Sequence, residues 1–428
     1  MESRYYDSLE TAPRAEIERL QERKLLSQLA DVVPQQPLLR DLWQKAGVTM
    51  SDIRSVADFQ TRAPFMDKDM IRAWRDEHDD PFGGILACDP TELSSLGSSS
   101  GTTGDATLFA YRRQVPGSWI FHSGQLWELG LRPGDFAVDL TMSTRGIGYE
   151  MYTKMGAIPL LVDHDPGDLL RLIELSRKYR PKMLFMISSP LLIALEQLEG
   201  DGVDIAEAFS SYEAVIFGGE PLSTRLKSVC ARWKMPIYQM SSLGDSGTGF
   251  ECRERDGFHV YDDLALAEII DPETGAPLGD GERGELVVTN LSDKTAPLIR
   301  YRTGDLVRLT REPCACGRTQ SRYWVLGRAG DELVIDGRSV IPIDIWSAVE
   351  TIEECSAGLF QIIRPHRSVD VLRLRVGHRN ATNLQELEQR VSAAVEASLG
   401  IRPEVELVPN AELLKLGPPH KIPRVAKK

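Results

Sequence analysis

Hydrophobic and polar positions along the chain change their pattern once, near residue 249. Between residues 135 and 219, short β-rich runs such as FAVDL, MLFMIS and AVIFGG alternate with helical patterns at 168–179 and 191–198. Strands that alternate with helices of this length predict a parallel sheet in an α/β fold. After Gly249, strand-like runs are joined by Asp-Gly and Thr-Gly turn signals, as in DPETGAPLGDGERGELVVTNL. This pattern predicts an antiparallel region or a small β-barrel-like part appended to the α/β part.

The last part of the chain has a pattern of its own. It predicts a hairpin over Asp336-Gly337, then a strand, a helix at 384–399 and another strand. The helix is the best-marked element of the chain, because Thr382 and Gln385 have the spacing of a capping box and Gly400 supplies a C-terminal stop. These elements together predict a small α+β unit.

The chain is too long for one ordinary core, since 428 residues correspond to roughly two or three domains. Apolar residues among charges at 15–33 predict an amphipathic docking helix with a structural role. We expect a large amino-terminal region of several subdomains at 1–329, and a small mobile carboxy-terminal domain at 330–428.

Composition and charge narrow the class of protein. A chain with 42% hydrophobic and 26% charged residues, 35 Gly and 25 Pro has the profile of a globular protein and not of a coiled coil or a disordered chain. A net charge of −13 repels polyanions, so we expect no nucleic-acid partner. No apolar run approaches the roughly 18 residues of a membrane span, and the polar start MESRYYDSLE lacks a signal core. We expect no membrane association and a cytoplasmic location.

Four residues form a candidate metal site. Cys252 and His259 flank an Asp-Gly turn, and Cys314 and Cys316 form a second knuckle. Three thiolates and one imidazole make a closed tetrahedral set that suits structural zinc. The alternative is that the three cysteines are reduced and lie in unrelated parts of the fold. The C-x-C spacing is tighter than in a usual zinc knuckle and favours this alternative.

A glycine- and hydroxyl-rich run, SSLGSSSGTTGDAT, occupies residues 94–107. Free backbone N–H groups and hydroxyls in such a loop can surround phosphate oxygens, which makes it a candidate phosphate cradle. By composition alone a flexible loop is an equal reading. It is not a Walker loop, because no Gly-Lys-Ser/Thr follows. The candidate residues are Ser99, Ser100, Gly101, Thr102, Thr103 and Gly104.

From this loop onward the sequence resembles the adenylate-forming superfamily of acyl- and aryl-CoA ligases and adenylation domains. Five further motifs follow in the family's order: Phe217-Gly218-Gly219-Glu220-Pro221, Tyr238-Gln239-Met240-Ser241-Ser242, Tyr301-Arg302-Thr303-Gly304-Asp305, Gly327-Arg328 and Lys421-Ile422-Pro423-Arg424. Within the superfamily, the short length and the stretches APLIRYRTGDLVRL and CACGRT are most similar to phenylacetate-CoA ligases. The resemblance covers most of residues 90–428, and some of these relatives carry a similar Cys/His cluster.

The resemblance implies a two-step enzyme. ATP and Mg²⁺ would activate a carboxylic acid, expected to be aromatic, as an acyl-adenylate, and rotation near Gly330 and Asp331 would then admit coenzyme A. An amine or a carrier-protein thiol is an alternative acceptor. Asp305 would hold the ribose hydroxyls, Arg328 would support the ribose or phosphate side, and Lys421 would bridge the substrate carboxylate and the phosphate.

The resemblance also assigns the remaining contacts. The glycine-rich loop together with Gly219, Glu220, Pro221, Tyr238 and Ser241 would bind ATP or AMP. The acyl pocket would lie near Tyr149, Tyr152, Gly218 and Met240, although the two tyrosines are equally readable as core or surface residues. A homodimer is a further possibility of this family.

Two positions depart from the family's pattern. The usual lysine of the glycine-rich loop is Asp105, and the usual acidic residue of the aromatic motif is Ser242. One hypothesis is that Asp105 or Asp245 supplies a Mg²⁺-binding carboxylate from a new position. The alternative is a degenerate, non-catalytic protein that binds an acid or a nucleotide.

Overall fold

The computed structural model describes residues 4–98, 108–112, 123–140, 147–219, 222–243, 247–366, 368–379, 381–416 and 422–427. The chain forms two compact units, which are described separately below. Unit 1 comprises Met1–Gly219 and Arg232–Trp324, and unit 2 comprises Glu220–Ala231 and Val325–Lys428. The expectation of a mobile domain at 330–428 stays a prediction. No helix of the described residues is long and apolar enough to cross a membrane.

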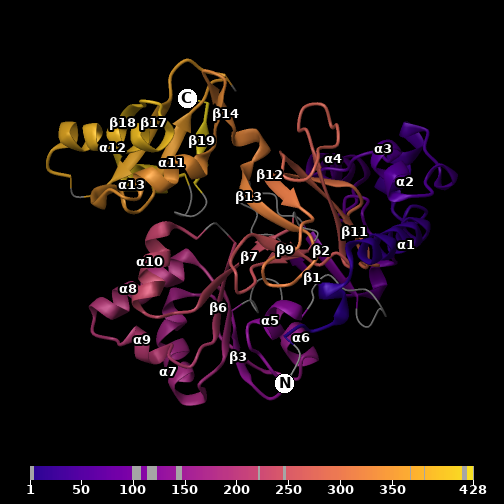
Figure 1. Cartoon of the computed structure of the whole chain (residues 1–428), viewed down its shortest axis with the longest axis horizontal. Helices are drawn as coiled ribbons and strands as arrows, with labels where there is room; N and C mark the ends of the chain where they lie inside the picture. Colours follow the sequence, from indigo (N-terminus) through magenta and orange to yellow (C-terminus); the bar gives the residue numbers. More distant parts are fainter. Residues whose placement is uncertain are drawn as a thin grey trace. The chain divides into compact units, whose positions relative to one another are not determined.

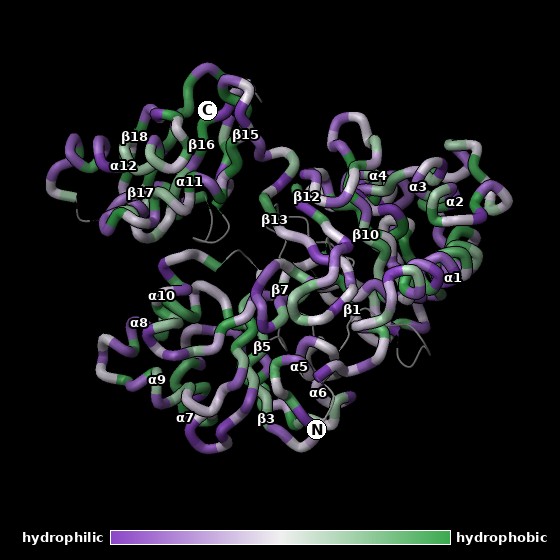
Figure 2. The backbone as a smooth tube through the Cα atoms, viewed as in Figure 1, coloured by the Kyte–Doolittle hydropathy of each residue, from purple (hydrophilic) through white to green (hydrophobic). Residues whose placement is uncertain are grey.

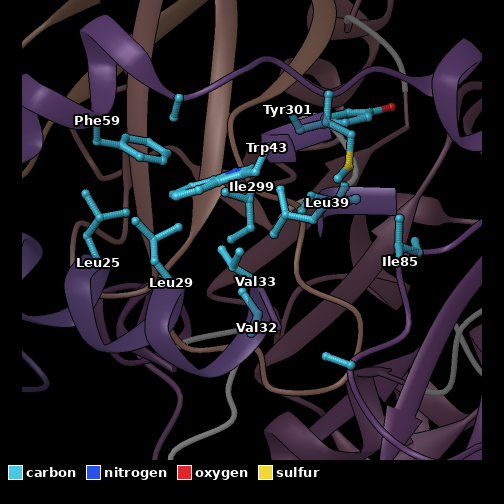
Figure 3. Packing of buried hydrophobic residues seen from close by; sticks show 14 of the residues in the cluster. Leu25, Leu29, Val32, Val33, Leu39, Trp43, Phe59, Ile85, Ile299 and Tyr301 are labelled. Atoms are coloured by element: carbon cyan, nitrogen blue, oxygen red, sulfur yellow. The ribbon is translucent and has the colours of Figure 1, made fainter. Parts of the chain in front are cut away.

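Unit 1 begins with a helical subdomain made of α1 (Arg14–Val32), α2 (Pro37–Ala46), α3 (Val56–Arg62) and α4 (Lys68–His78). The predicted amphipathic helix is confirmed, because α1 buries one face that includes Leu25 and Leu29. Figure 3 shows these side chains directed toward Trp43 of α2 and toward Ile299, all in one hydrophobic cluster. Proline at the start of α2 and left-handed Gly47 (φ 66°) after its end fix the length of that helix.

The rest of unit 1 is built around an eleven-stranded sheet, in the order β10-β11-β12-β13-β9-β8-β7-β6-β5-β3-β4. The strands from β4 to β7 pair in parallel, as predicted. Figure 1 places α5 and α6 on one side of these strands and α7, α8 and α9 on the other, and the strands are hydrophobic over much of their length in Figure 2. The parallel strands are β3 (Phe136–Asp139), β4 (Ile158–Leu161), β5 (Met183–Ile187), β6 (Ala214–Gly218) and β7 (Ile237–Ser242). The helices are α5 (Gly124–Glu128), α6 (Ile147–Lys154), α7 (Leu169–Tyr179), α8 (Ser189–Gly200) and α9 (Ile205–Ala208).

The antiparallel region predicted after Gly249 is present, and its strands continue the same sheet. Pairing is antiparallel from β7 to β8, β8 to β9 and β9 to β13, and from β10 through β12. The expected small barrel is not confirmed, since this order is that of one sheet with ends at β10 and β4. The strands are β8 (Thr248–Phe250), β9 (Phe258–Val260), β10 (Ala265–Ile270), β11 (Arg283–Asn290), β12 (Tyr301–Thr310) and β13 (Arg322–Arg328). A separate pair is formed by β1 (Leu93–Ser98) and β2 (Leu108–Arg112).

Unit 2 is an α+β unit around a four-stranded sheet in the order β18-β17-β16-β19. The predicted hairpin over Asp336-Gly337 is confirmed, and both residues have positive φ, as a tight two-residue turn requires. The predicted helix and its stop at Gly400 (φ 65°) are confirmed too. Its cap was predicted wrongly, because the Asn383 side chain accepts from the Glu386 N–H in place of the Thr382–Gln385 pair.

The elements of unit 2 are α10 (Thr224–Arg232), β14 (Leu333–Ile335), β15 (Arg338–Val340), α11 (Pro342–Val349), β16 (Phe360–Ile363), β17 (Arg373–His378), α12 (Leu384–Leu399), β18 (Glu404–Pro409), α13 (Asn410–Leu414) and β19 (Val425–Ala426). Short 3-10 turns complete the chain: η1 (Ser8–Thr11), η2 (Met50–Asp52), η3 (Pro90–Glu92), η4 (Pro166–Asp168), η5 (Ala329–Asp331) and η6 (Glu353–Cys355).

Candidate functional site

The carboxyl ends of β6 and β7 bring two of the predicted motifs together. Gly218 is the last residue of β6 and pairs with Met240 of β7. Gly219 follows at φ 92°, a conformation that glycine adopts without strain. Ser241 and Ser242 lie one step further along β7. Ligands of open α/β sheets bind at this edge, so the motifs are positioned for binding.

Asp305 lies in a bulge of β12. The register with β11 pairs Arg302 with Val287 and Leu306 with Glu285, so that three residues of β12 stand opposite one residue of β11. Gly304 takes φ 71°, and its N–H donates to Glu285 Oε1 at 3.1 Å. Bulges next to functional sites re-aim a side chain. The YRTGD motif therefore contains a bulge that displaces Asp305 from the regular alternation of side chains along β12.

Tyr323 of β13 joins these two regions. Its phenol is fully buried, and burial raises its pKa above the ordinary value. The adjacent Ser241 side chain opposes that pKa shift, and the Asp305 carboxylate adds to it. Ser241 of β7 and Asp305 of β12 therefore both act on the electrostatics of one phenol. Sequence reasoning missed Tyr323, because RYW reads as an ordinary strand and only the sheet order places it here.

The four predicted acyl-pocket residues differ in environment. Gly218 is buried and Met240 is half-buried at the strand ends. Tyr152 is fully buried, and its hydroxyl donates to the Val138 carbonyl at 3.4 Å. Tyr149, also on α6, is 46% exposed. Tyr238 is buried, with the guanidinium of Arg255 4.5 Å from its ring centre.

Several predicted residues lie outside the described part of the chain. They are Ser99, Ser100, Gly101, Thr102, Thr103, Gly104, Asp105, Glu220, Pro221, Asp245 and Lys421. Ser242, where the family has an acidic residue, is described and exposed at the end of β7.

Arg328 and the predicted hinge belong to unit 2. Arg328 is exposed at the end of β13 and precedes the turn η5. Arg364 donates to the Gly330 and Glu332 carbonyls, at 2.5 Å in both cases, and so holds the middle and the C-terminal end of the turn. Burial raises the pKa of Asp331 inside the turn, against the opposing effect of Arg328 and Arg364. Sequence reasoning missed Arg364, which lies in no motif.

The segment that follows Lys421 is held firmly in unit 2. Ile422 is buried with Leu359 and Leu413. Arg424 lies between two aromatic rings, with its guanidinium 4.4 Å from the Trp346 ring centre and 4.7 Å from that of Phe360.

Cys252, His259, Cys314 and Cys316 come together in unit 1. All four are buried, and their ligand atoms lie within 4.8 Å of one another. The Cys252 and Cys314 sulfurs are 4.0 Å apart, and Cys316 Sγ is 3.5 Å from His259 Nε2. Contact with Cys252, and then with His259, holds the pKa of the Cys316 thiol far below its ordinary value. The set can therefore bind a metal ion.

These separations suit a tetrahedral metal. With Zn–S near 2.3 Å and Zn–N near 2.0–2.1 Å, tetrahedral geometry places two sulfurs about 3.8 Å apart, and a sulfur and a nitrogen about 3.6 Å apart. The four ligand atoms close the coordination sphere, which is typical of structural sites.

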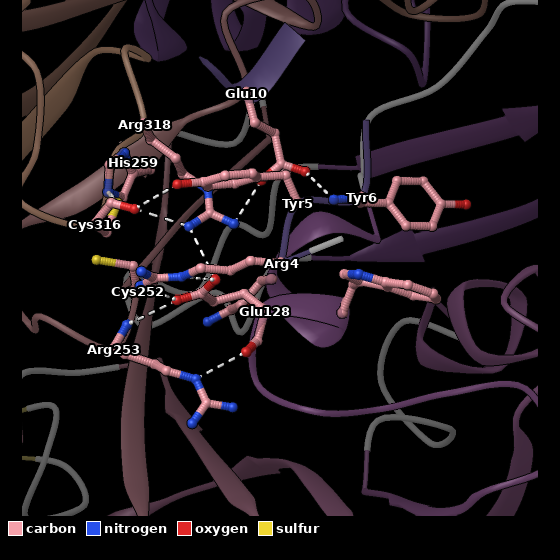
Figure 4. Close-up of polar contacts among 12 residues, drawn as sticks. Arg4, Tyr5, Tyr6, Glu10, Glu128, Cys252, Arg253, His259, Cys316 and Arg318 are labelled. Atoms are coloured by element: carbon pink, nitrogen blue, oxygen red, sulfur yellow. Dashed lines mark hydrogen bonds and ion pairs between the residues drawn. The ribbon is translucent and has the colours of Figure 1, made fainter. Parts of the chain in front are cut away.

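A buried arginine ties this cluster to the amino-terminal segment (Figure 4). Arg318 Nε donates to Glu10 at 2.7 Å, and its Nη1 lies 3.2 Å from Glu128 and 3.7 Å from Cys316 Sγ. Tyr5 donates its hydroxyl proton to the Cys316 carbonyl at 2.9 Å. All three ionic side chains are fully buried. Sequence reasoning missed Arg318, because CGRT reads as an exposed turn.

Comparison with known proteins gives relatives along the whole chain. A phenylacetate-coenzyme A ligase of Thermus thermophilus is 30% identical over 440 residues, which cover 95% of this chain and 95% of the relative. The enzyme of the same name from Escherichia coli is 28% identical over 419 residues, covering 94% and 93%. No family model matches the chain.

Among solved structures, a 2-hydroxyisobutyryl-CoA ligase in the postadenylation state, in complex with its acyl-adenylate, matches with a TM-score of 0.83. The identity is 25%, and the match covers 100% of this chain and 93% of that one. The same ligase in the thioesterification state, with acyl-adenylate and CoA, matches at 26% identity with a TM-score of 0.69 over 99% and 92%.

Proposed function

This chain belongs to the phenylacetate-coenzyme A ligase family of adenylate-forming enzymes, and we propose that it activates an aromatic or related apolar carboxylic acid with ATP and transfers the acyl group to coenzyme A. The observation that carries the proposal is the sheet edge at which the ends of β6 and β7 bring Gly218, Met240 and Ser241 together, with Asp305 set in the bulge of β12, in a chain related to these ligases over 95% of its length.

In the first half-reaction a carboxylate oxygen of the acid attacks the α-phosphorus of ATP. A new P–O bond forms, the bond to the bridging oxygen breaks, and pyrophosphate leaves. Asp305 accepts hydrogen bonds from the ribose hydroxyls, a role that suits a carboxylate as a pure acceptor. Ser241 and the glycine-rich loop, whose residues 101–104 supply N–H groups, bind the nucleotide. Lys421 and Arg328 neutralise charge on the carboxylate and the phosphate.

In the second half-reaction the thiolate of coenzyme A attacks the acyl carbonyl. A C–S bond forms, the bond to the phosphate oxygen breaks, and AMP leaves. We propose that residues 330–428 rotate about the turn at 329–332 between the two steps, which withdraws Lys421. The support is that a related ligase adopts separate postadenylation and thioesterification states, and that Arg364 donates to two carbonyls of this turn, those of Gly330 and Glu332.

Magnesium would neutralise the phosphates, and a carboxylate is expected among its ligands. Ser242 offers a hydroxyl where the family has an acid. Asp105 or Asp245 is therefore proposed to supply that contact. If Asp105→Lys raised the adenylation rate while Asp105→Ala left it unchanged, the role of Asp105 would be refuted, and Asp245→Ala then tests the second position.

We also propose structural zinc at Cys252, His259, Cys314 and Cys316. The fit of the interatomic distances to a tetrahedron and the burial of all four residues support it. Bound zinc would fasten two loops to each other and, through Arg318, to the amino-terminal segment. A closed site has no position for substrate, so its role is in folding.

The test of the proposed activity is pyrophosphate release with ATP, Mg²⁺ and a panel of aryl, arylacetic and small aliphatic acids. Removing one charge-stabilising group from a transition state slows a reaction roughly 10²- to 10³-fold, and Lys421→Ala should have an effect of this size. Lys415→Ala is the matched control, because this exposed lysine pairs only with Glu412 among the described contacts. Release without dependence on an acid, or an unimpaired Lys421→Ala variant, would contradict the proposal.

A further inference from the structure

Met186 interrupts the pairing of β5 with β6. Phe185 pairs with Ile216 and Ile187 pairs with Phe217, which leaves Met186 as an extra residue on β5. Its φ is 70°, in the left-handed region that residues with a Cβ rarely adopt. The bulge lies near the carboxyl end of β5 (Met183–Ile187), at the same edge of the sheet as Gly218 and Met240.

The bulge directs the Met186 side chain toward the candidate acyl site. A Cβ placed on Gly218 would lie 2.8 Å from Met186 Sδ and 3.2 Å from its Cε, so the thioether lies directly over this glycine. The same Cβ would be 3.6 Å from the Met240 carbonyl oxygen. Met186 packs on the hydrophobic cluster that holds Phe185 and Tyr238, and it remains half-buried.

Three features of Met186 indicate that its side chain has a functional role beyond packing. Its backbone is strained in a way that glycine would avoid, and such strain marks positions where the side chain has a use. A bulge re-aims a side chain beside a functional site. Methionine is unbranched and polarisable, so it fills an irregular gap against aliphatic or aromatic groups. A residue needed only for the core would sit in the regular register, as Met183 does in the same strand.

We propose that Met186 is a specificity-determining residue: its thioether forms the wall against which the far end of the acyl group rests, and it limits the length of an apolar acid. This inference rests on the proposed function. The side chain beside Gly218 is a thioether, and it packs on a hydrophobic cluster that also holds Tyr238, so the substrate class is a carboxylic acid with an apolar distal end.

The experiment measures kcat/KM for pyrophosphate release with two acids: the best acid of the panel, and its homologue longer by one methyl or methylene at the distal end. One methylene in an apolar pocket is worth roughly 10- to 200-fold in discrimination. Met186→Ala should therefore raise the ratio of the longer to the shorter acid by about tenfold or more. Met186→Leu keeps most of the side-chain volume and should leave the ratio near that of the wild type.

Met183→Ala is the matched control, because it makes the same truncation at a fully buried position of the same strand. It should lower thermal stability and leave the ratio unchanged. An unchanged ratio in Met186→Ala, or an equal shift in Met183→Ala, would overturn the proposal.

Failure of the proposed function gives a different result. If the wild type released no pyrophosphate with any acid, the proposed enzymatic activity would be refuted, but the proposed contact of Met186 with the acyl group would not. The Met186 assignment is then decided by calorimetric binding of two acids: the acid of the panel that binds most tightly, and its homologue longer by one methyl or methylene at the distal end. A Kd ratio that shifts in Met186→Ala but not in Met183→Ala supports it, and an unshifted ratio overturns it.

Discussion

A buried carboxyl group, Glu268 of β10, makes the stability of the chain depend on pH. Glu268 is 3% exposed, and its nearest cation is Arg300, at 3.7 Å from Arg300 Nε. Burial raises the pKa of Glu268 from 4.5 to about 7, and the attraction of Arg300 and then Arg311 offsets this only in part. Burial also lowers the pKa of Arg300. The pKa shifts of both groups therefore indicate that the attraction between them is smaller than the cost of removing the two charges from water.

The sign follows from proton binding. Between pH 4.5 and about 7 the folded state retains a proton on Glu268 that the unfolded chain has lost, so stability falls as pH rises through this window and is level above it. At about 1.4 kcal/mol for each pH unit, the total is about 3 kcal/mol. Glu268→Gln removes the titrating group, while Arg300 keeps its donors on the Ala63 and Gln60 carbonyls.

The assay is urea unfolding of the full chain, followed by tryptophan fluorescence, at pH 5, 6, 7 and 8. The wild type should lose about 2.5 kcal/mol relative to Glu268→Gln between pH 5 and pH 8, because the first half unit of the window lies below pH 5. The exposed Glu312→Gln serves as the control and should run parallel to the wild type. A wild-type-minus-Glu268→Gln difference that stays constant to within about 0.5 kcal/mol across this range would refute the reasoning.

Three further predictions concern the metal cluster, its buried ion network and the carboxy-terminal strand. Purified protein should contain about one zinc per chain, measured by plasma emission, and a content under ~0.2 zinc in the wild type contradicts the site. Cys314→Ser should lose the zinc, whereas Cys230→Ser, at a buried cysteine outside the cluster, should keep it. Arg318→Met leaves two buried carboxylates without their shared cation and should destabilise the chain by about 3–5 kcal/mol in urea unfolding, whereas a loss below about 1 kcal/mol would show that the network is not needed. Arg424→Ala should slow adenylation about tenfold or more, because Arg424 anchors the strand that follows Lys421, and loss of Lys421 itself should slow this step roughly 10²-fold or more. Thioester formation from a supplied acyl-adenylate should change by less than about twofold. Equal slowing of both steps would contradict a positioning role for Arg424.

The sequence predicted those features whose physical cause is local. The α12 stop at Gly400 and the hairpin at Asp336-Gly337 depend on left-handed residues that their own positions reveal. The alternation of strands and helices before residue 219 follows from hydrophobic period alone. The family resemblance rested on ordered motifs and is confirmed by relatives that cover nearly the whole chain.

The features that were missed depend on register and on distant partners. Met186 has its role only because β5 carries a bulge against β6, and an MLFMI run shows no bulge. Arg318 is buried because Glu10 and Glu128 approach it from distant segments, which no pattern around CGRT announces. The change of pattern at Gly249 predicted an antiparallel region or a small barrel-like part; the antiparallel region is present, and it continues the α/β sheet because β8 pairs directly with β7. Which strands pair across residue 249 depends on the tertiary structure, and local hydrophobic periodicity does not encode it.

The most direct test of the central claim is acid-dependent release of pyrophosphate from ATP by the wild type, with the Asp305→Asn and Lys421→Ala variants measured beside it. The account predicts release that requires one class of apolar acid, falls roughly 10²-fold or more without Lys421, and shows a raised KM for ATP in Asp305→Asn. Nucleotide binding that persists while no acid elicits release would contradict it and would identify the chain as a binder that retains the fold without the chemistry.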